Sequence, residues 1–314
     1  MKRRMIKKVL LAKISNWLTS IEDDEVRAIA KGNVIVSGGS IASMLLGEKV
    51  NDFDVYFRNK ESCLAVAKYY LKKFCELHPD WESENSKTTK PHIVVDDAGR
   101  IKIWIQSAGI SGEGSQNGYE YFESCPDDTA QDYVEKVVTE ADETDSQPLE
   151  ESTKSKFRPV YMSANAITLS DKVQLIIRFY GEPDDLHKNF DYVHCMNYWT
   201  SWDNELVLNP IALESLLSKQ LFYQGSLYPV CSVIRSRKFI QKGWYINAGQ
   251  FLKMCFQISE LDLNDFEVLE EQLTGVDAAY FHQVIDYCKH RQASDSDFKI
   301  SAPYLISIVD KIFG

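Results

Sequence analysis

The stretch 34-VIVSGGSIASMLLGEKVNDFDVYF-57 combines an apolar run, a pair of glycines and two spaced aspartates. Residues 34–37 are β-branched and end at glycine, which predicts a short buried strand. Residues 40–46 predict a helix that Gly47 ends. Residues 52–57 alternate polar and apolar side chains and then become apolar, which predicts a second strand. The stretch therefore predicts a strand, a turn, a helix and another strand in close succession.

The two aspartates of this stretch predict a metal site. Asp52 and Asp54 are two positions apart on the expected strand, so their side chains point to one face while Phe53 points to the other. Two carboxylates on one face repel each other unless a cation lies between them. Carboxylate oxygens are preferred ligands of Mg²⁺ and Mn²⁺. The alternative is a polar strand edge, because the pattern D-x-D alone is common.

The glycines predict an anion site beside the aspartates. Gly38 and Gly39 lack side chains, so a ligand can approach the backbone closely. Ser40 adds a hydroxyl group, and the expected helix presents free N–H groups and the positive end of its dipole. A dinucleotide site is disfavoured because the fingerprint G-x-G-x-x-G is absent. A phosphate site next to a metal site is what nucleoside triphosphate chemistry needs.

A two-metal site also requires a third carboxylate from another strand. The best candidate is Asp191 in 190-FDYVH-194, which we expect to be an apolar strand in which a carboxylate has no obvious partner. We expect Asp52, Asp54 and Asp191 to be the catalytic and metal-binding residues. The alternative for Asp191 is a satisfied buried carboxylate or a residue at a strand edge.

The stretch resembles the DNA polymerase β nucleotidyltransferase superfamily, and more closely its tRNA CCA-adding and bacterial poly(A) polymerase branch. That branch has the pattern G-G-x-V-R-D-L-L-L-G-x-x-x-x-D-x-D, and residues 38–54 match it without a gap at seven positions. The matching residues are Gly38, Gly39, Leu45, Leu46, Gly47, Asp52 and Asp54. The branch's later R-R-D-F-T-I-N-A has a loose counterpart in residues 187–198, where Asp191 stands at the family aspartate.

Two departures from the family pattern concern positive charge. The family's Arg-Asp after the glycines is Ala42-Ser43, and its later Arg-Arg is Lys188-Asn189. The first change removes a cation expected near the triphosphate or the 3′ end. The neck motif that selects C and then A has no clear counterpart. Fold and reaction type are therefore better supported by the resemblance than CCA addition.

Basic residues further along the chain are candidates for nucleotide binding. Arginine pairs with phosphate oxygens, and aromatic rings stack on bases. A basic cluster just before Trp244 and Tyr245 consists of Arg235, Arg237, Lys238 and Lys242. A solvated helix face is the alternative interpretation of this cluster. His194 is more simply explained as a structural residue than as a base. The predicted nucleotide-binding residues are Gly38, Gly39, Ser40, Arg178, Arg235, Arg237 and Lys242.

Composition limits the class of protein without deciding its function. The chain has 314 residues and a formal net charge of −11, of which residues 119–155 contribute −10 through twelve acids and two lysines. The acidity therefore does not exclude a basic groove elsewhere. Seven cysteines without a C-x-x-C pair argue against zinc and disulfides and predict a cytoplasmic protein. No apolar run is long enough to predict a membrane span.

Periodicity predicts an α+β fold: a nucleotidyltransferase-type mixed β-sheet with flanking helices, followed by an all-helical C-terminal region. We expect a catalytic domain at 1–209, with an acidic insertion at about 107–155 that contains one short helix near 128–140, and a helical domain at 210–314. Expected helices are 3–20, a short one within 21–33, 61–77, 211–223, 230–243, 246–259, 277–291 and 303–313. Expected strands are a hairpin at 92–106, two strands within 160–181 and one at 189–199.

The resemblance implies a metal-dependent nucleotidyltransferase with Mg²⁺ or Mn²⁺ as cofactor and a nucleoside triphosphate (NTP) as substrate. It would move a nucleoside monophosphate to an acceptor hydroxyl, by resemblance a tRNA-like RNA 3′ end, and release pyrophosphate. One alternative is a toxin-like or protein-modifying nucleotidyltransferase with a protein acceptor. Another is a catalytically silent nucleotide-binding or scaffold protein. The sequence does not specify the nucleotide, the number of additions or the oligomeric state.

Overall fold

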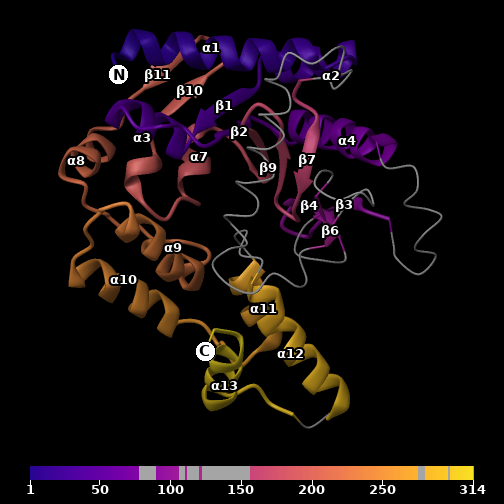
Figure 1. The fold of residues 1–314 in the computed structure, drawn as a ribbon, viewed down its shortest axis with the longest axis vertical. Coiled ribbons are helices and arrows are strands. Elements are labelled where there is room, and N and C mark those ends of the chain that lie inside the picture. Colours follow the sequence, from indigo (N-terminus) through magenta and orange to yellow (C-terminus); the bar gives the residue numbers. More distant parts are fainter. Residues whose placement is uncertain are drawn as a thin grey trace.

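The structure is a computed structural model that describes residues 1–77, 90–105, 110–111, 120–121, 156–274, 280–295 and 298–313. A large mixed sheet with flanking helices forms the N-terminal part, and helices make up the chain beyond it (Figure 1). This arrangement confirms the α+β class. The predicted helix near 128–140 lies outside the described residues.

Nine of the described strands form the large sheet. In spatial order they are β11 (Glu205–Val207), β10 (Tyr198–Thr200), β1 (Val34–Ser37), β2 (Phe53–Phe57), β9 (Val173–Tyr180), β8 (Ala166–Leu169), β7 (Pro159–Met162), β5 (Ile110–Ser111) and β6 (Glu120–Tyr121). Among the described pairs, β2 with β9 is parallel and the others are antiparallel. The sheet therefore places two strands far apart in sequence side by side at its centre.

The first helices cover one face of this sheet. They are α1 (Arg3–Ser20), α2 (Asp24–Lys31) and α4 (Lys60–Leu77), which lie together in Figure 1. Helix α1 repeats apolar residues every three or four positions, and Ile6, Leu10 and Ile14 are fully buried as a result. Trp17 of α1 donates a hydrogen bond of 2.9 Å from Nε1 to the hydroxyl of Tyr70 in α4. These contacts fix the two long helices against the sheet.

Strand alternation gives the sheet two different faces. In β2, Phe53, Val55 and Phe57 join the apolar core beneath α1 and α4. Asp54 and Tyr56 turn to the other face, because side chains alternate along a strand. That second face carries polar residues such as Asp54 and also an apolar cluster that includes Ile35 and Tyr56.

A separate hairpin and a short helix complete the N-terminal part. Strands β3 (His92–Val95) and β4 (Ile101–Trp104) pair antiparallel in a sheet of their own, which confirms the predicted hairpin. Helix α3 (Gly39–Leu46) connects β1 to the segment before β2, as predicted.

The later helices of the described chain are α7 (Pro183–His187), α8 (Pro210–Ser218), α9 (Pro229–Gln241), α10 (Ala248–Ser259), α11 (Phe266–Thr274), α12 (Tyr280–Ser294) and α13 (Ala302–Phe313). Helix α11 was not predicted. Residues of α9, α11, α12 and α13 share an apolar cluster separate from the core of the sheet. A second cluster crosses residue 209, since Ala42 packs with Leu216 and Trp244. The domain boundary at 209 stays a prediction.

Two strand predictions were wrong. The segment 189–199 contains a bend, the 3₁₀ turn η2 (Val193–Cys195) and only the start of β10. Its alternating aromatic residues pack against neighbouring helices and rings instead of a strand ladder; Tyr192, for example, contacts Phe239. The segment 160–181 contains three strands instead of two, because the chain also turns at residues 163–165.

None of the described helices is both long enough and apolar enough to cross a membrane.

Candidate functional site

Gly38 allows the turn after β1 to lie against Asp54 of β2. It follows β1 with φ 96° and ψ −152°, a backbone region that essentially only glycine occupies. A Cβ atom on this residue would lie 2.6 Å from Oδ2 of Asp54. Its N–H donates a hydrogen bond of 3.0 Å to the carbonyl of Cys195. The glycine therefore lets the Asp54 carboxylate lie directly against the backbone of the turn.

Helix α3 starts immediately after this glycine and presents its N-terminus to the same place. Its first N–H groups have no partner within the helix and carry partial positive charge. Ser40 in the first turn is 2% exposed, and its Oγ has no hydrogen-bond partner. Such a buried hydroxyl costs free energy unless a ligand satisfies it. Gly38, Gly39 and Ser40 all line one cavity, so the helix start is suited to an anion.

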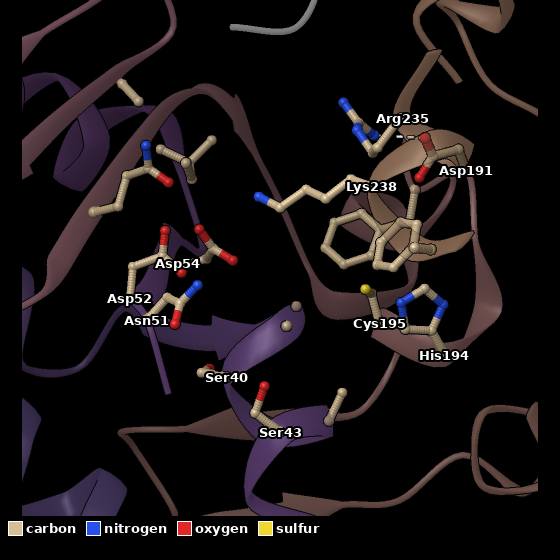
Figure 2. A pocket seen from close by; sticks show the side chains of 18 of the residues that line it. Ser40, Ser43, Asn51, Asp52, Asp54, Asp191, His194, Cys195, Arg235 and Lys238 are labelled. Atoms are coloured by element: carbon tan, nitrogen blue, oxygen red, sulfur yellow. Dashed lines mark hydrogen bonds and ion pairs between the residues drawn. The ribbon is translucent and has the colours of Figure 1, made fainter. Parts of the chain in front are cut away.

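Asp52 and Asp54 line this cavity as well. Phe53 between them is buried in the core, so the two carboxylates share a face, as expected from strand alternation. Figure 2 shows them together on one side of the pocket, with Asn51 beside Asp52. On the neighbouring strand β9, Gln174 is paired with Asp54.

The cavity has a volume of about 670 Å³ and lies between the sheet and the later helices. We call the side formed by the β1–α3 turn, β2 and β9 the strand wall. The opposite side, the α9 wall, is formed by α9 and the segment before β10. The strand wall contributes Gly38, Ser40, Asp52, Asp54 and Gln174, and the α9 wall contributes Asp191, His194, Arg235, Lys238 and Phe239. Figure 2 shows the Lys238 ammonium pointing across the pocket toward the carboxylates.

Asp191 does not join the other two aspartates. It lies in a bend on the α9 wall and not in a strand, which corrects the sequence-based expectation. Its side chain is 9% exposed and accepts a hydrogen bond of 2.5 Å from Nη1 of Arg235. Among the described residues, no three His, Cys, Asp or Glu side chains are grouped so that they could hold a metal ion. The structure thus pairs Asp191 with a guanidinium group instead of assembling the expected triad.

Arg178 lines the cavity, and its guanidinium is hydrogen-bonded within the protein. It is 4% exposed. Its Nε donates to the Tyr228 hydroxyl over 3.0 Å, and its Nη1 donates to Oδ1 of Asn165 over 3.0 Å. Arg178 thus links β9 to the start of α9, and its guanidinium has protein partners; its role in nucleotide binding stays a prediction.

The other predicted cations differ in their position on α9. Arg235 lines the cavity but is held by Asp191. Lys242, one residue beyond α9, also lines the cavity, whereas Arg237 is exposed and does not. Lys238, which we left out of the predicted site residues, does line it. The helical spacing of this cluster could have separated Lys238 from Arg237, because adjacent positions on a helix face different directions.

His194 forms part of an aromatic cluster on the α9 wall. Its ring centroid lies 4.4 Å from that of Trp244 and 4.6 Å from that of Phe239. Burial lowers the pKa of His194 to about 3, so the imidazole is neutral at physiological pH. Its Nδ1 has no hydrogen-bond partner. This environment agrees with a structural role, as the sequence suggested.

The donor groups of the strand wall fit one divalent cation. Mg²⁺ is commonly bound by one or two carboxylates together with substrate phosphates. Asp52 and Asp54 supply two carboxylates, and the side-chain amides of Asn51 and Gln174 line the same cavity. The start of α3 would receive phosphate groups next to this ion.

Comparison with solved structures finds two complexes of CCA-adding enzymes. One is the Thermotoga maritima CCA-adding enzyme with tRNA, 12% identical, with a TM-score of 0.35 over 78% of this chain and 45% of that chain. The other is a CCA-adding enzyme with CTP, 12% identical, with a TM-score of 0.36 over 83% and 48% of the two chains. The specific branch inferred from the sequence stays a prediction.

Comparison by sequence gives a closer assignment. The protein "Gabija anti-defense 2" of Bacillus phage SPbetaL7 is 22% identical over 143 residues, which are 45% of this chain and 33% of the phage protein. The matched segment thus spans about a third of that relative. Residues 8–219, more than half of the chain, match the family described as "Gabija anti-defense 2 family protein". The matched range includes Gly38, Asp52 and Asp54, and the chain belongs to the Gabija anti-defense 2 family.

Proposed function

We propose that this protein is a metal-dependent nucleotidyltransferase that binds an NTP in the cavity between the strand wall and the α9 wall. The observation that carries the proposal is the contact of the Asp54 carboxylate with Gly38, at the start of a helix whose buried Ser40 hydroxyl has no partner. This contact supports the proposal, because carboxylate oxygens commonly bind a divalent cation and a helix start commonly binds a phosphate. A metal-bound triphosphate needs both.

Residues of both walls would contribute to binding the metal and the triphosphate. Asp52 and Asp54 would hold a Mg²⁺ or Mn²⁺ ion, which when bound supplies charge stabilisation on the phosphate oxygens. The first N–H groups of α3 and the Ser40 hydroxyl would bind the terminal phosphates. Lys238 and Lys242 would offset the remaining negative charge from the opposite side. Together these contacts would orient the α-phosphate for in-line attack and hold the pyrophosphate as it leaves.

The acceptor that we propose is an RNA 3′ hydroxyl. This choice rests on the sequence resemblance of residues 38–54 to the tRNA CCA-adding and poly(A) polymerase branch. A protein hydroxyl is the alternative acceptor, and the labelling experiment below distinguishes the two. We further propose, from the name of its family, that the protein counters the Gabija defence and that it does so through this site.

The first test is a labelling experiment. The purified protein is incubated with each α-labelled NTP and Mg²⁺ or Mn²⁺, with total RNA in one sample and cell protein in another. Label on RNA supports the proposal and identifies the nucleotide, and label on protein replaces the proposed acceptor. The double variant Asp52→Asn/Asp54→Asn should lose the label. Asp310→Asn, an exposed acid on α13, is the matched control and should keep it.

A second test determines whether the proposed activity against the Gabija defence depends on this cavity. Cells that carry the Gabija defence are infected with a sensitive phage while they express the wild type, the double variant or Asp310→Asn. The proposal predicts that phage growth is rescued by the wild type and the control but not by the double variant. Rescue by a well-folded double variant would show that anti-defence does not depend on these carboxylates.

A further inference from the structure

A groove between α1 and the turn that joins β10 to β11 is lined mainly by cations. It has a volume of about 630 Å³, and we call it the α1 groove. The described residues that line it are Arg3, Arg4, Lys7, Lys8, Leu11, Asn204 and Glu205. These four cations and one carboxylate give the groove a formal charge of +3, although the whole chain has a formal net charge of −11. The α1 groove is therefore a positive site on an acidic protein.

The single carboxylate of the α1 groove pairs with only part of this charge. Glu205 forms an ion pair with Arg3 and another, over 3.3 Å, with Lys7. In the part of the chain that the structure describes, it does not pair with Arg4 or Lys8, whose side chains are exposed. Arg4 and Lys8 are four positions apart on α1, so they lie on the same face of the helix. Both can therefore meet an anion that arrives from solvent.

The stability of α1 does not explain these cations. Arg3 and Arg4 lie in its first turn, at the positive end of the helix dipole, where acidic residues are favourable and basic residues are not. The first turn of α1 contains no acidic residue, and its N-cap forms no side-chain hydrogen bond. Helix α2, in contrast, has a capping aspartate followed by two acidic residues. The binding of a polyanion would account for positive charge at a place where it destabilises the helix.

The α1 groove lies close to the helix that carries the proposed phosphate site. The amino group of Met1, just before α1, donates a hydrogen bond of 2.9 Å to the carbonyl of Met44 in α3. Helix α3 has eight residues and is therefore about 12 Å long, and Figure 1 shows it next to the start of α1. Ser43 and Leu46 of α3 line the cavity between the two walls. One extended polyanion could therefore contact both sites.

The chemistry of the α1 groove favours a phosphate backbone as its ligand. Arginine forms paired hydrogen bonds with phosphate oxygens, and lysine contributes a point charge. Together such residues bind a nucleic-acid backbone whatever its sequence. A lipid surface is disfavoured, because Ile6 and Leu10 of α1 are buried in the core, and a helix that lies on a membrane needs its apolar face exposed.

We propose that the α1 groove binds the phosphate backbone of the RNA whose 3′ end enters the cavity. The inference rests on the RNA acceptor proposed above and adds the surface that holds this RNA. Contacts to the backbone position a nucleic acid but carry no sequence information. The α1 groove would therefore strengthen the binding of any RNA and leave the choice of nucleotide to the cavity.

The test measures RNA binding without metal, NTP or turnover. The full chain is titrated against a fluorescent RNA hairpin with a single-stranded 3′ end, and fluorescence anisotropy is recorded at several salt concentrations. Loss of two phosphate contacts in Arg4→Gln/Lys8→Gln should weaken binding by about tenfold at low salt and reduce the slope of log K against log salt by about 2. The midpoint of urea denaturation should not fall, because neither side chain pairs with Glu205 and Arg4 lies at the unfavourable end of the dipole.

The matched control removes the same charge elsewhere. Lys299→Gln/Lys311→Gln changes exposed positions just before and on α13, which lies far from α1 in Figure 1. Its affinity and salt slope should equal those of the wild type. An equal loss in this control would mean that the protein attracts RNA through its overall charge, and the inference about the α1 groove would be overturned.

The remaining outcomes separate this inference from the proposed function. Unchanged RNA affinity and slope in a folded Arg4→Gln/Lys8→Gln variant would overturn the role of the α1 groove and leave the NTP site unaffected. If polyglutamate displaces the hairpin from the wild type but not from this variant, and does so as well as unlabelled RNA, the groove binds an acidic protein instead. If the wild type binds no RNA, the α1 groove inference and the RNA acceptor fail together. Mn²⁺-dependent binding of an NTP, measured separately, then decides whether the rest of the proposed function holds.

Discussion

The two walls of the cavity are built in different ways. The strand wall comes largely from one short stretch, in which a glycine of unusual backbone conformation contacts the carboxylate of Asp54. The α9 wall depends on Asp191 and Arg235, which are 44 positions apart in sequence. Local geometry therefore specifies the first wall, and tertiary packing specifies the second. We expect mutations to separate the two: changes in the strand wall should weaken ligand binding, and loss of the Asp191–Arg235 pair should lower stability first.

The strongest test of the strand wall is Gly38→Ala. The new Cβ would lie 2.6 Å from Oδ2 of Asp54, and the backbone would be strained by about 1–3 kcal/mol. If the carboxylate is displaced, a charge-assisted ligand contact worth about 1.5–3 kcal/mol is lost. We expect metal–nucleotide affinity to fall by about 10- to 100-fold, measured by Mn²⁺ titration in the presence of an ATP analogue whose α–β bridge is a methylene group.

The matched control for this substitution is Gly32→Ala. A Cβ at Gly32 has nothing within 4 Å and its φ of −97° suits alanine, so affinity should stay at the wild-type value. Unchanged affinity in Gly38→Ala would show that the contact between the turn and Asp54 does not determine binding.

The α9 wall is tested by breaking its ion pair. Asp191→Asn leaves the guanidinium of Arg235 without its carboxylate, and we expect a loss of about 3 kcal/mol in the free energy of unfolding. Arg235→Met should cost a similar amount, and the double variant should cost less than the sum of the two. Urea denaturation measures all three.

Asp54→Asn is the comparison variant for the Asp191–Arg235 ion pair. It should weaken metal binding with little effect on unfolding, since the carboxylate faces the cavity. If Asp191→Asn instead lowered the number of Mn²⁺ ions bound per protein and left the free energy of unfolding unchanged, Asp191 would be a metal ligand, as the sequence suggested.

Acid should destabilise the part of the molecule that contains the buried histidines. Burial lowers the pKa of His194 to about 3, and burial lowers that of His187 to about 4. In the unfolded chain these residues take up protons below about pH 6.5, so the unfolded state binds more protons between that pH and the folded-state pKa. Stability is therefore complete above about pH 6.5 and is lost as the pH falls.

The expected loss at pH 5 is about 2 kcal/mol for each histidine. It is measured by urea denaturation at pH 7 and pH 5. His194→Leu should remove close to half of this pH dependence, and equal pH dependence in the variant and the wild type would contradict the assignment.

The same division explains what the sequence could and could not predict. Glycines, strand alternation and the helix stop are local signals, so the strand at 34–37 and the cavity-facing pair Asp52 and Asp54 were placed correctly. The guanidinium of Arg178 is taken by Tyr228, a contact between positions 50 apart, and no local pattern indicates it. The position of Gln174 next to Asp54 was not predicted, because it depends on the parallel pairing of β2 with β9.

The smallest expected effect distinguishes two neighbours on α9. Lys238 lines the cavity and points toward the carboxylates in Figure 2, whereas the exposed Arg237 does not line it. Loss of one charge-assisted contact to a phosphate predicts about a tenfold weaker affinity for the ATP analogue in Lys238→Ala. Arg237→Ala should change the affinity by less than about twofold, as expected for an exposed surface charge. Isothermal titration at low and high salt makes the comparison. Equal losses that vanish together at high salt would mean that α9 acts through its overall charge, whereas a loss confined to Lys238→Ala that persists in salt would identify a direct phosphate contact from the α9 wall.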